Sequence, residues 1–170
     1  EVKTPTLLNY VNNILDISIG KNHTMLLTTK GKVLTSGLNS YGQTGKTEGK
    51  TNIFTQIEVP ATVGKISSVD NHIVLLTTNG EVYGWGENGS GQLGISNTED
   101  QKLPVKTTLT NIKQISTSYY HTIALTEDGK AYVAGRNNEG ELGIGQTTSS
   151  TITTWTIMKS TNGTSEMTGI

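Results

Sequence analysis

The stretch HIVLLTTNGEVYGWGENGSGQLG, residues 72–94, decides the fold because its pattern occurs three times at a spacing of 49 residues. A fixed period of about 20–50 residues indicates a repeat architecture, in which each unit buries its core only against its neighbours. The sequence therefore predicts one repeat domain over residues 1–170, with units at about 12–60, 61–109 and 110–158 and a tail at 159–170. The positions that keep the spacing include His23/His72/His121, Gly37/Gly86/Gly135, Asn39/Asn88/Asn137 and Ile17/Ile66/Ile115.

The second copy shows how one unit is built. Residues 72–77 form a nearly continuous apolar run, which is typical of a strand buried on both faces. Residues 81–86 alternate, and Asn79-Gly80 between the two runs favours a hairpin with a tight primed turn. Short runs at 66–69 and near 103–109 complete three to four strands. The predicted fold class is all-β, because such units at this spacing are typical of propeller blades.

These motifs resemble the repeat of the regulator of chromosome condensation (RCC1) family. The resemblance rests on residues 72–94 and on residues 121–143 of the third copy, and it extends more weakly to residues 23–45 of the first. It covers roughly residues 12–158. The sequence departs from the family where a glycine is usual before the histidine pair, because Gly20 is kept while Val69 and Ser118 replace it.

The resemblance implies blades of a seven-bladed propeller in a family whose members act through protein-binding faces. Three units cannot close a ring, since propellers have about four to eight blades, so we expect a partial or open propeller. Its end faces are then uncovered. We expect self-association, contact with the remaining blades of a longer parent chain, or cover from the end segments Glu1–Tyr10 and Ser160–Ile170. The apolar residues expected near the uncovered faces are Ile14, Ile17, Ile112 and Ile115.

Residues that recur in all three units are most simply explained by what each unit needs to fold. The histidines occupy three equivalent places, so we interpret them as buried structural residues that satisfy backbone groups inside each unit, and not as a metal or catalytic cluster. The glycines allow positive φ or close backbone approach. Residues 84–89 also match G-x-G-x-x-G, but no helix follows, which argues against a nucleotide site. The predicted structural residues are His23, His72, His121, Gly37, Gly86 and Gly135.

Composition narrows the classes of function. A net charge of −1 with pI near 6.3 offers no basic field for a nucleic acid, and the absence of cysteine excludes disulfides and thiolate chemistry. No apolar run reaches the roughly 18 residues of a membrane helix. The sequence contains no motif that implies a cofactor or metal. Its polar, weakly charged character is common in secreted or cell-surface bacterial proteins, although the compartment stays open.

A variable pair of residues precedes each repeated histidine. In a propeller these short connections emerge on one rim, so the three pairs are expected to line up along one face. Two adjacent tyrosines on such a rim are typical of a contact hot spot, although one of them could instead pack into its own unit. The predicted partner-binding residues are Lys21, Asn22, Asp70, Asn71, Tyr119 and Tyr120. The loops 46–52, 95–102 and 144–151 form a second candidate surface.

Three functions follow from these observations. The first is a non-catalytic protein–protein interaction module that binds a protein partner through its rim. The second is a structural spacer within a larger secreted surface protein or toxin, which equal repeats and threonine-rich loops suit. The third, a sugar-binding or enzymatic propeller, requires charged and aromatic groups at a closed ring axis, which an incomplete ring lacks.

Overall fold

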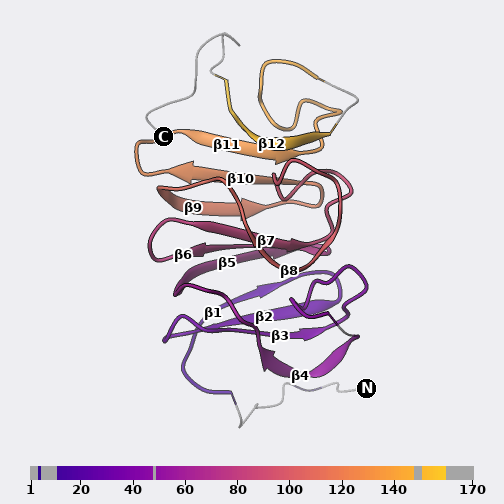
Figure 1. Ribbon diagram of the computed structural model, residues 1–170, viewed down its shortest axis with the longest axis vertical. Helices are drawn as coiled ribbons and strands as arrows, with labels where there is room; N and C mark the ends of the chain where they lie inside the picture. The colour runs from indigo at the N-terminus through magenta and orange to yellow at the C-terminus, as the bar shows by residue number, and fades with distance from the viewer. Residues whose placement is uncertain (1–3, 5–10, 48, 148–150, 160–170) are drawn as a thin grey trace.

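A computed structural model describes residue 4 and residues 11–47, 49–147 and 151–159. These residues form three four-stranded antiparallel sheets stacked one behind another along the long axis of the molecule (Figure 1). No helix occurs in the described residues, so none of them lies in a helix long and apolar enough to cross a membrane. The twelve strands are β1 (Ile14–Ile19), β2 (His23–Thr28), β3 (Val33–Gly37), β4 (Thr51–Gln56), β5 (Val63–Val69), β6 (His72–Thr77), β7 (Val82–Gly86), β8 (Gln101–Lys106), β9 (Ile112–Thr117), β10 (His121–Thr126), β11 (Ala131–Gly135) and β12 (Ile152–Ile157).

Each sheet follows the chain order and lies within one of the three predicted units. The first strands β1, β5 and β9 contact one another along one edge of the stack, while β4, β8 and β12 form the opposite edge. This arrangement is that of propeller blades whose ring is not closed. The predicted all-β fold with three blade-like units is confirmed.

The core lies between the sheets. Met25, Leu27 and Val33 of the first sheet pack against Ile66, Ile73, Leu75, Tyr83 and Trp85 of the second. The opposite face of the second sheet presents Val74, Leu76 and Val82 to Ile112, Ile115 and Ala124 of the third. Alternate residues of β6 therefore serve two interfaces, which explains why this strand is buried at every position. Each fully buried aliphatic side chain contributes about 1.5–3 kcal/mol relative to an exposed one.

The prediction that Ile112 and Ile115 lie on an uncovered end face is wrong. Both side chains are buried, because β9 packs against β5 and β6 of the preceding sheet. The uncovered face of the third sheet instead carries Ile123 and Leu125. Ile17 on β1 is exposed as expected, while Ile14 is half-buried. The segments Glu1–Tyr10 and Ser160–Ile170, expected as covers, lie outside the described residues apart from Thr4.

The hairpin between β6 and β7 differs from the predicted two-residue turn. The Thr77 N–H bonds to the Glu81 carbonyl at 2.9 Å, and the Gly80 N–H bonds to the Thr77 carbonyl at 3.1 Å. Only Gly80 has a positive φ, at 80°, so the loop is a three-residue turn that ends in a left-handed glycine. Gly31 and Gly129 have the same conformation in the other two units.

The fourth strands do not keep the 49-residue period. β4, β8 and β12 begin at residues 51, 101 and 152, so the spacing grows to 50 and then 51 residues. The added residues lie in the loops that precede these strands. The last strand of the second unit lies at Gln101–Lys106, slightly before the predicted 103–109.

Candidate functional site

The three variable pairs lie in the β1–β2, β5–β6 and β9–β10 connections, at the same end of the stacked sheets; we call these six residues the rim. Their backbone is fixed from the neighbouring strand. The carbonyls of Asn22, Asn71 and Tyr120 accept N–H groups at 2.8, 3.1 and 2.9 Å from the residues that directly follow Gly37, Gly86 and Gly135. These glycines have φ of 122°, 92° and 125°, and a Cβ there would lie 2.2–2.3 Å from the same carbonyl oxygens. Glycine is therefore required at these three positions.

The rims of the first and second units touch. The Lys21 N–H donates to the Asp70 carbonyl at 2.8 Å, and the Lys21 ammonium lies 3.8 Å from the Asp70 carboxylate. Asp70 has a positive φ of 52°, an uncommon conformation that aspartate tolerates better than most residues. Lys21 and Asn22 are both exposed. The structure thus brings two of the predicted residues, Lys21 and Asp70, together at the seam between the first and second units.

Asn71 is an exception to the predicted exposed rim. Its side chain is buried, and its amide oxygen accepts from Gln43 of the first unit at 3.3 Å. Its amide nitrogen donates to Asp70 at 3.1 Å and to Glu87 at 3.0 Å. Because both ends of the amide are engaged, the side chain of Asn71 links the two units and is not available at the surface.

Tyr119 and Tyr120 form the aromatic part of the rim. Tyr119 is 61% exposed and Tyr120 38%, with ring centroids 6.2 Å apart. The guanidinium of Arg136 lies 4.7 Å from the Tyr120 ring centroid, within the range of a cation–π contact. Its Nε also donates to Glu141 at 2.9 Å. Tyr120 therefore packs between the guanidinium of Arg136, itself bonded to Glu141, and the more exposed ring of Tyr119.

Tyr41 belongs to the same end of the molecule and was not predicted as a contact residue. It lies in the loop that follows β3, is 38% exposed, and its N–H donates to the Gln43 amide oxygen at 2.8 Å. The sequence did mark this position as variable, because the equivalent positions in the other units hold Ser90 and Glu139. Tyr41 was not selected because it lies inside the glycine-rich signature, which was interpreted as structural.

The loops of the second candidate surface are partly occupied within the fold. The Ser96 N–H donates to the Thr153 carbonyl at 2.8 Å, and Ile95 forms a bridge with Thr154 of β12. Asn88 closes this loop, since its amide accepts from the Leu93 N–H at 3.0 Å and donates to the Asn97 carbonyl at 3.0 Å. The loop between β7 and β8 is thus fixed to the next unit.

The repeated histidines lie at the start of the second strand of each unit, and His72 points forward, toward the unit that follows. His72 is buried, and its Nε2 lies 3.1 Å from the Thr122 hydroxyl of the third unit, so it bonds across an interface and not to the backbone of its own unit. Burial lowers its pKa to about 3. His23 is also buried, which lowers its pKa to about 4, with Asp70 acting in the opposite direction. His121 is only half-buried, with a smaller lowering of its pKa from the same cause.

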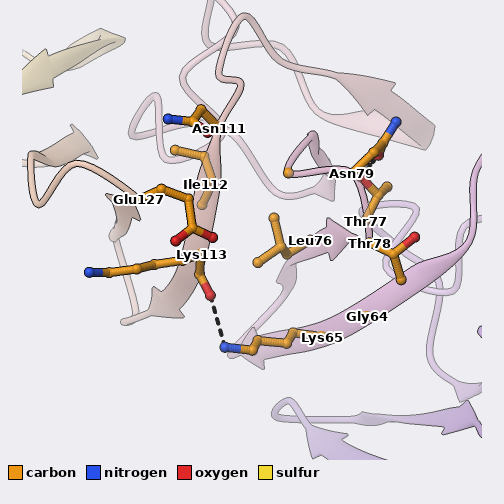
Figure 2. A pocket seen from close by; sticks show the side chains of 11 residues that line it. Gly64, Lys65, Leu76, Thr77, Thr78, Asn79, Asn111, Ile112, Lys113 and Glu127 are labelled. Carbon is orange, nitrogen blue, oxygen red and sulfur yellow. Dashed lines mark hydrogen bonds between the residues drawn. The ribbon is translucent and has the colours of Figure 1, made fainter.

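A pocket of about 410 Å³ lies at the opposite end of the sheets, between the second and third units (Figure 2). Lys65 closes one side of it by donating from Nζ to the Lys113 carbonyl at 2.8 Å. The Thr77 hydroxyl is engaged by Asn79 and by the Glu81 carbonyl. The Lys65 bond crosses the seam between the two units, whereas the Thr77 bonds close the β6–β7 hairpin. In the described part of the chain, no three acidic, histidine or cysteine side chains gather as metal ligands.

Sequence comparison places this architecture in a known family. The regulator of chromosome condensation (RCC1) repeat matches residues 14–43, 64–92 and 112–141, and a second description of the same repeat matches residues 79–125. These matches cover more than half of the chain. The chain belongs to the RCC1 repeat family. No curated protein matches the sequence.

Solved structures, among them yeast RCC1, share the fold. Yeast RCC1 (Prp20), solved with Kap60, superposes with a TM-score of 0.81 at 20% identity, over 90% of this chain and 38% of that one. Prp20p from Saccharomyces cerevisiae gives 0.78 at 21% identity, over 90% and 40%, and human WBSCR16 gives 0.78 at 19%, over 90% and 39%. The chain thus spans about two fifths of the length of these structures.

Proposed function

We propose that this RCC1-repeat protein is a non-catalytic interaction module that binds a protein partner through its rim. The observation that carries the proposal is the exposed pair Tyr119 and Tyr120, of which Tyr120 packs against the guanidinium of Arg136. Tyrosine offers a large contact area at low entropy cost, and ordering before binding reduces the cost further.

The composition of the rim supports a protein ligand. Tyr41, Tyr119 and Tyr120 are the exposed aromatic side chains of the described residues, and all three lie at this end of the sheets. Lys21 adds an exposed positive charge at the same end of the first unit. Aromatic anchors are typical of protein interfaces.

The solved relatives are consistent with this class of function. Yeast RCC1 was crystallised with Kap60, and Prp20p has been studied for binding to Gsp1p and histones. Those partners belong to those proteins. What is carried over to this chain is the use of an RCC1 fold for protein binding.

The test compares two matched double variants as immobilised baits. Tyr119→Ala/Tyr120→Ala removes the rim aromatics, while Ile53→Ala/Leu103→Ala removes exposed apolar residues from the outer strands β4 and β8. Proteins retained from an extract of the source organism are quantified by mass spectrometry. We expect a partner that the unchanged chain and the outer-strand variant retain and the rim variant loses.

The affinity of that purified partner is then measured by calorimetry. Tyr120→Ala is expected to weaken binding by about fivefold or more, with an unchanged melting temperature. A partner that binds both variants equally would move the site away from the rim. Failure of the unchanged chain to retain any protein above a blank matrix would instead support a structural spacer.

A further inference from the structure

The first unit has an uncovered rear face, on the side where a preceding unit would pack. Ile17, Ile66 and Ile115 occupy the same repeat position in the three units. Ile66 and Ile115 are each 8% exposed because a preceding unit covers them, whereas Ile17 is 65% exposed. Ile19 on the same strand is 67% exposed. The rear face of the first unit is therefore built like an interface, with nothing in the described chain packed on β1 from that side.

The forward face of the third unit is not covered by any residue that the structure describes. Met25 and Leu27 of the first unit are fully buried, and so are their equivalents in the second unit. Ile123 and Leu125, at these positions in the third unit, are only half-buried. They line an apolar hollow of about 300 Å³ together with Ala131 and Met158. In the first and second units, the unit that follows packs on the equivalent residues.

A polar contact distinguishes the interfaces from one another. Between the second and third units, His72 bonds to the Thr122 hydroxyl, which donates at 2.8 Å to the Gln92 carbonyl. Between the first and second units, Ile73 stands at the position of Thr122. Both ring nitrogens of His23 accordingly lack a hydrogen-bond partner among the described residues. The histidine–threonine pair is thus formed at one interface and missing at the other.

The two uncovered faces carry the separated halves of this pair. His121 lies on the forward face of the third unit, at the position of His72. Thr24 lies on the rear face of the first unit, at the position of Thr122, and is half-buried. In the stretches that the structure describes, no hydrogen bond joins either side chain to another group. The described residues therefore contain the two halves of a donor–acceptor pair that a second copy of the chain would bring together.

We propose that the forward face of the third unit binds the rear face of the first unit in a second copy of this chain, head to tail, with His121 bonded to Thr24. The occupant is a second copy because the rear face supplies both the apolar residues and the hydroxyl that the forward face requires. The new contact continues the two interfaces already present in the stack. It is independent of the proposed rim function, which uses a different surface.

A second set of equivalent positions fixes the expected geometry. The hydroxyl oxygens of Ser18 and Ser68 lie 2.9 Å apart across the first interface. Those of Ser67 and Thr117, the next positions in the repeat, lie 2.8 Å apart across the second. The same relation predicts that Ser116 of one copy faces Ile19 of the other. Thiols placed there are within reach of a disulfide.

Head-to-tail contacts close into a ring if the rotation permits and otherwise extend as a filament. Two copies contribute six units, which lies within the range of about four to eight blades found in closed propellers. We therefore expect a closed pair with two identical contacts. The propeller axis of this pair coincides with its two-fold axis.

The chain lacks cysteine, so cross-linking is unambiguous. Ser116→Cys and Ile19→Cys chains are mixed under a mild oxidant and resolved by non-reducing electrophoresis. We expect a cross-linked dimer from this mixture, and none from Ser116→Cys mixed with Leu103→Cys, whose cysteine lies on the outer strand. Ser18→Cys/Ser68→Cys serves as a positive control, because it should close within one chain.

Sedimentation measures the assembly without cross-links. Leu125→Lys on the forward face is expected to give monomers at concentrations where the unchanged chain and Leu103→Lys are dimers. Thr24→Val should weaken association about tenfold, the effect of one lost hydrogen bond. Circular dichroism establishes that each variant is folded. A monomeric unchanged chain without the Ser116–Ile19 cross-link would overturn the proposal, as would equal assembly of Leu125→Lys and Leu103→Lys.

Discussion

The second unit and the two end units have nearly the same strands but different burial. Every residue of β6 is buried, whereas β2 and β10 each keep partly exposed positions. The difference does not come from hydrophobicity alone, because Leu125 is as apolar as Leu27 and Leu76. It comes from the number of neighbours, since among the three described sheets only the second has a neighbouring sheet on each face. In this chain, burial is a property of the stack more than of the single unit.

The two internal interfaces also differ from each other. The first contains Trp85, fully buried, with Nε1 donating to the Gln43 carbonyl at 3.2 Å. At this position the end units have Ser36 and Ala134. The second interface contains the His72–Thr122 hydrogen bond. Each interface thus combines a common apolar frame with one distinctive contact, so their contributions to stability can be separated by mutation.

The largest expected effect is that of Trp85→Ala. It removes the largest buried side chain of the first interface and should lower the free energy of unfolding by about 3–5 kcal/mol. Urea unfolding followed by circular dichroism measures it. Leu103→Ala, on an exposed part of β8, is the control and should change stability by less than about 0.5 kcal/mol. A loss below about 1 kcal/mol for Trp85→Ala would show that the first interface holds little of the core.

A direct test of the comparison uses one repeat position in two units. Ile66→Ala should cost about 2–4 kcal/mol, because Ile66 is packed between two sheets. Ile17→Ala should have almost no effect when measured in dilute solution, because the Ile17 side chain is 65% exposed among the described residues. Both are measured by thermal and urea unfolding at low protein concentration. Equal losses at the two positions would mean that burial by a neighbouring unit does not govern stability here.

Much of the fold could be predicted because the residues that repeat every 49 positions include those that the backbone conformation requires. Gly37, Gly86 and Gly135 recur because a side chain there would collide with the rim carbonyls. The fourth strands were placed less well, because loops of changing length shift them out of register. The end faces were also misassigned at Ile112 and Ile115, since periodicity shows that a position is apolar but not which neighbour covers it.

The candidate site could be predicted only in part. The principle that variable positions within a repeat are the candidates for function led to the rim and to its tyrosines. It did not anticipate the burial of Asn71, which depends on Gln43 and Glu87 from other segments. Nor did it show the direction in which the histidines point, because the partner of His72 lies 50 residues away in the next unit.

Acid should destabilise the protein through the buried histidines. An unfolded imidazole binds a proton near pH 6.5, whereas burial lowers the pKa of His72 to about 3 and that of His23 to about 4. Below pH 6.5 the unfolded chain therefore binds more protons, so stability is complete above this pH and falls as the pH drops toward 4. The slope is about 1.4 kcal/mol per pH unit for each histidine.

Urea unfolding between pH 6.5 and 5 measures this slope above the range of ordinary carboxylates. His72→Gln should remove about half of it. His121→Gln should remove less, because that ring is only half-buried at the end of the stack. A stability that is constant across this pH range, or an equal change in both variants, would contradict the assignment of the effect to burial within the stack.

The smallest expected effect is that of Lys21→Ala, which is compared with Asp70→Ala at the other end of the same ion pair. Lys21 belongs to the exposed rim of the first unit, with 66% of its side chain accessible, and its ammonium lies 3.8 Å from Asp70. Lys21→Ala should change stability by less than about 0.5 kcal/mol, since exposed ion pairs contribute little.

Asp70→Ala should cost more, about 1–2 kcal/mol, for two further reasons. It places alanine at a φ of 52°, and it removes the acceptor of an Asn71 hydrogen bond. Asp70→Gly relieves the backbone strain and should recover part of that loss. Urea unfolding of the three variants tests this order, and equal losses for Lys21→Ala and Asp70→Ala would show that the ion pair itself, and not the backbone conformation and Asn71 hydrogen bond of Asp70, carries the effect.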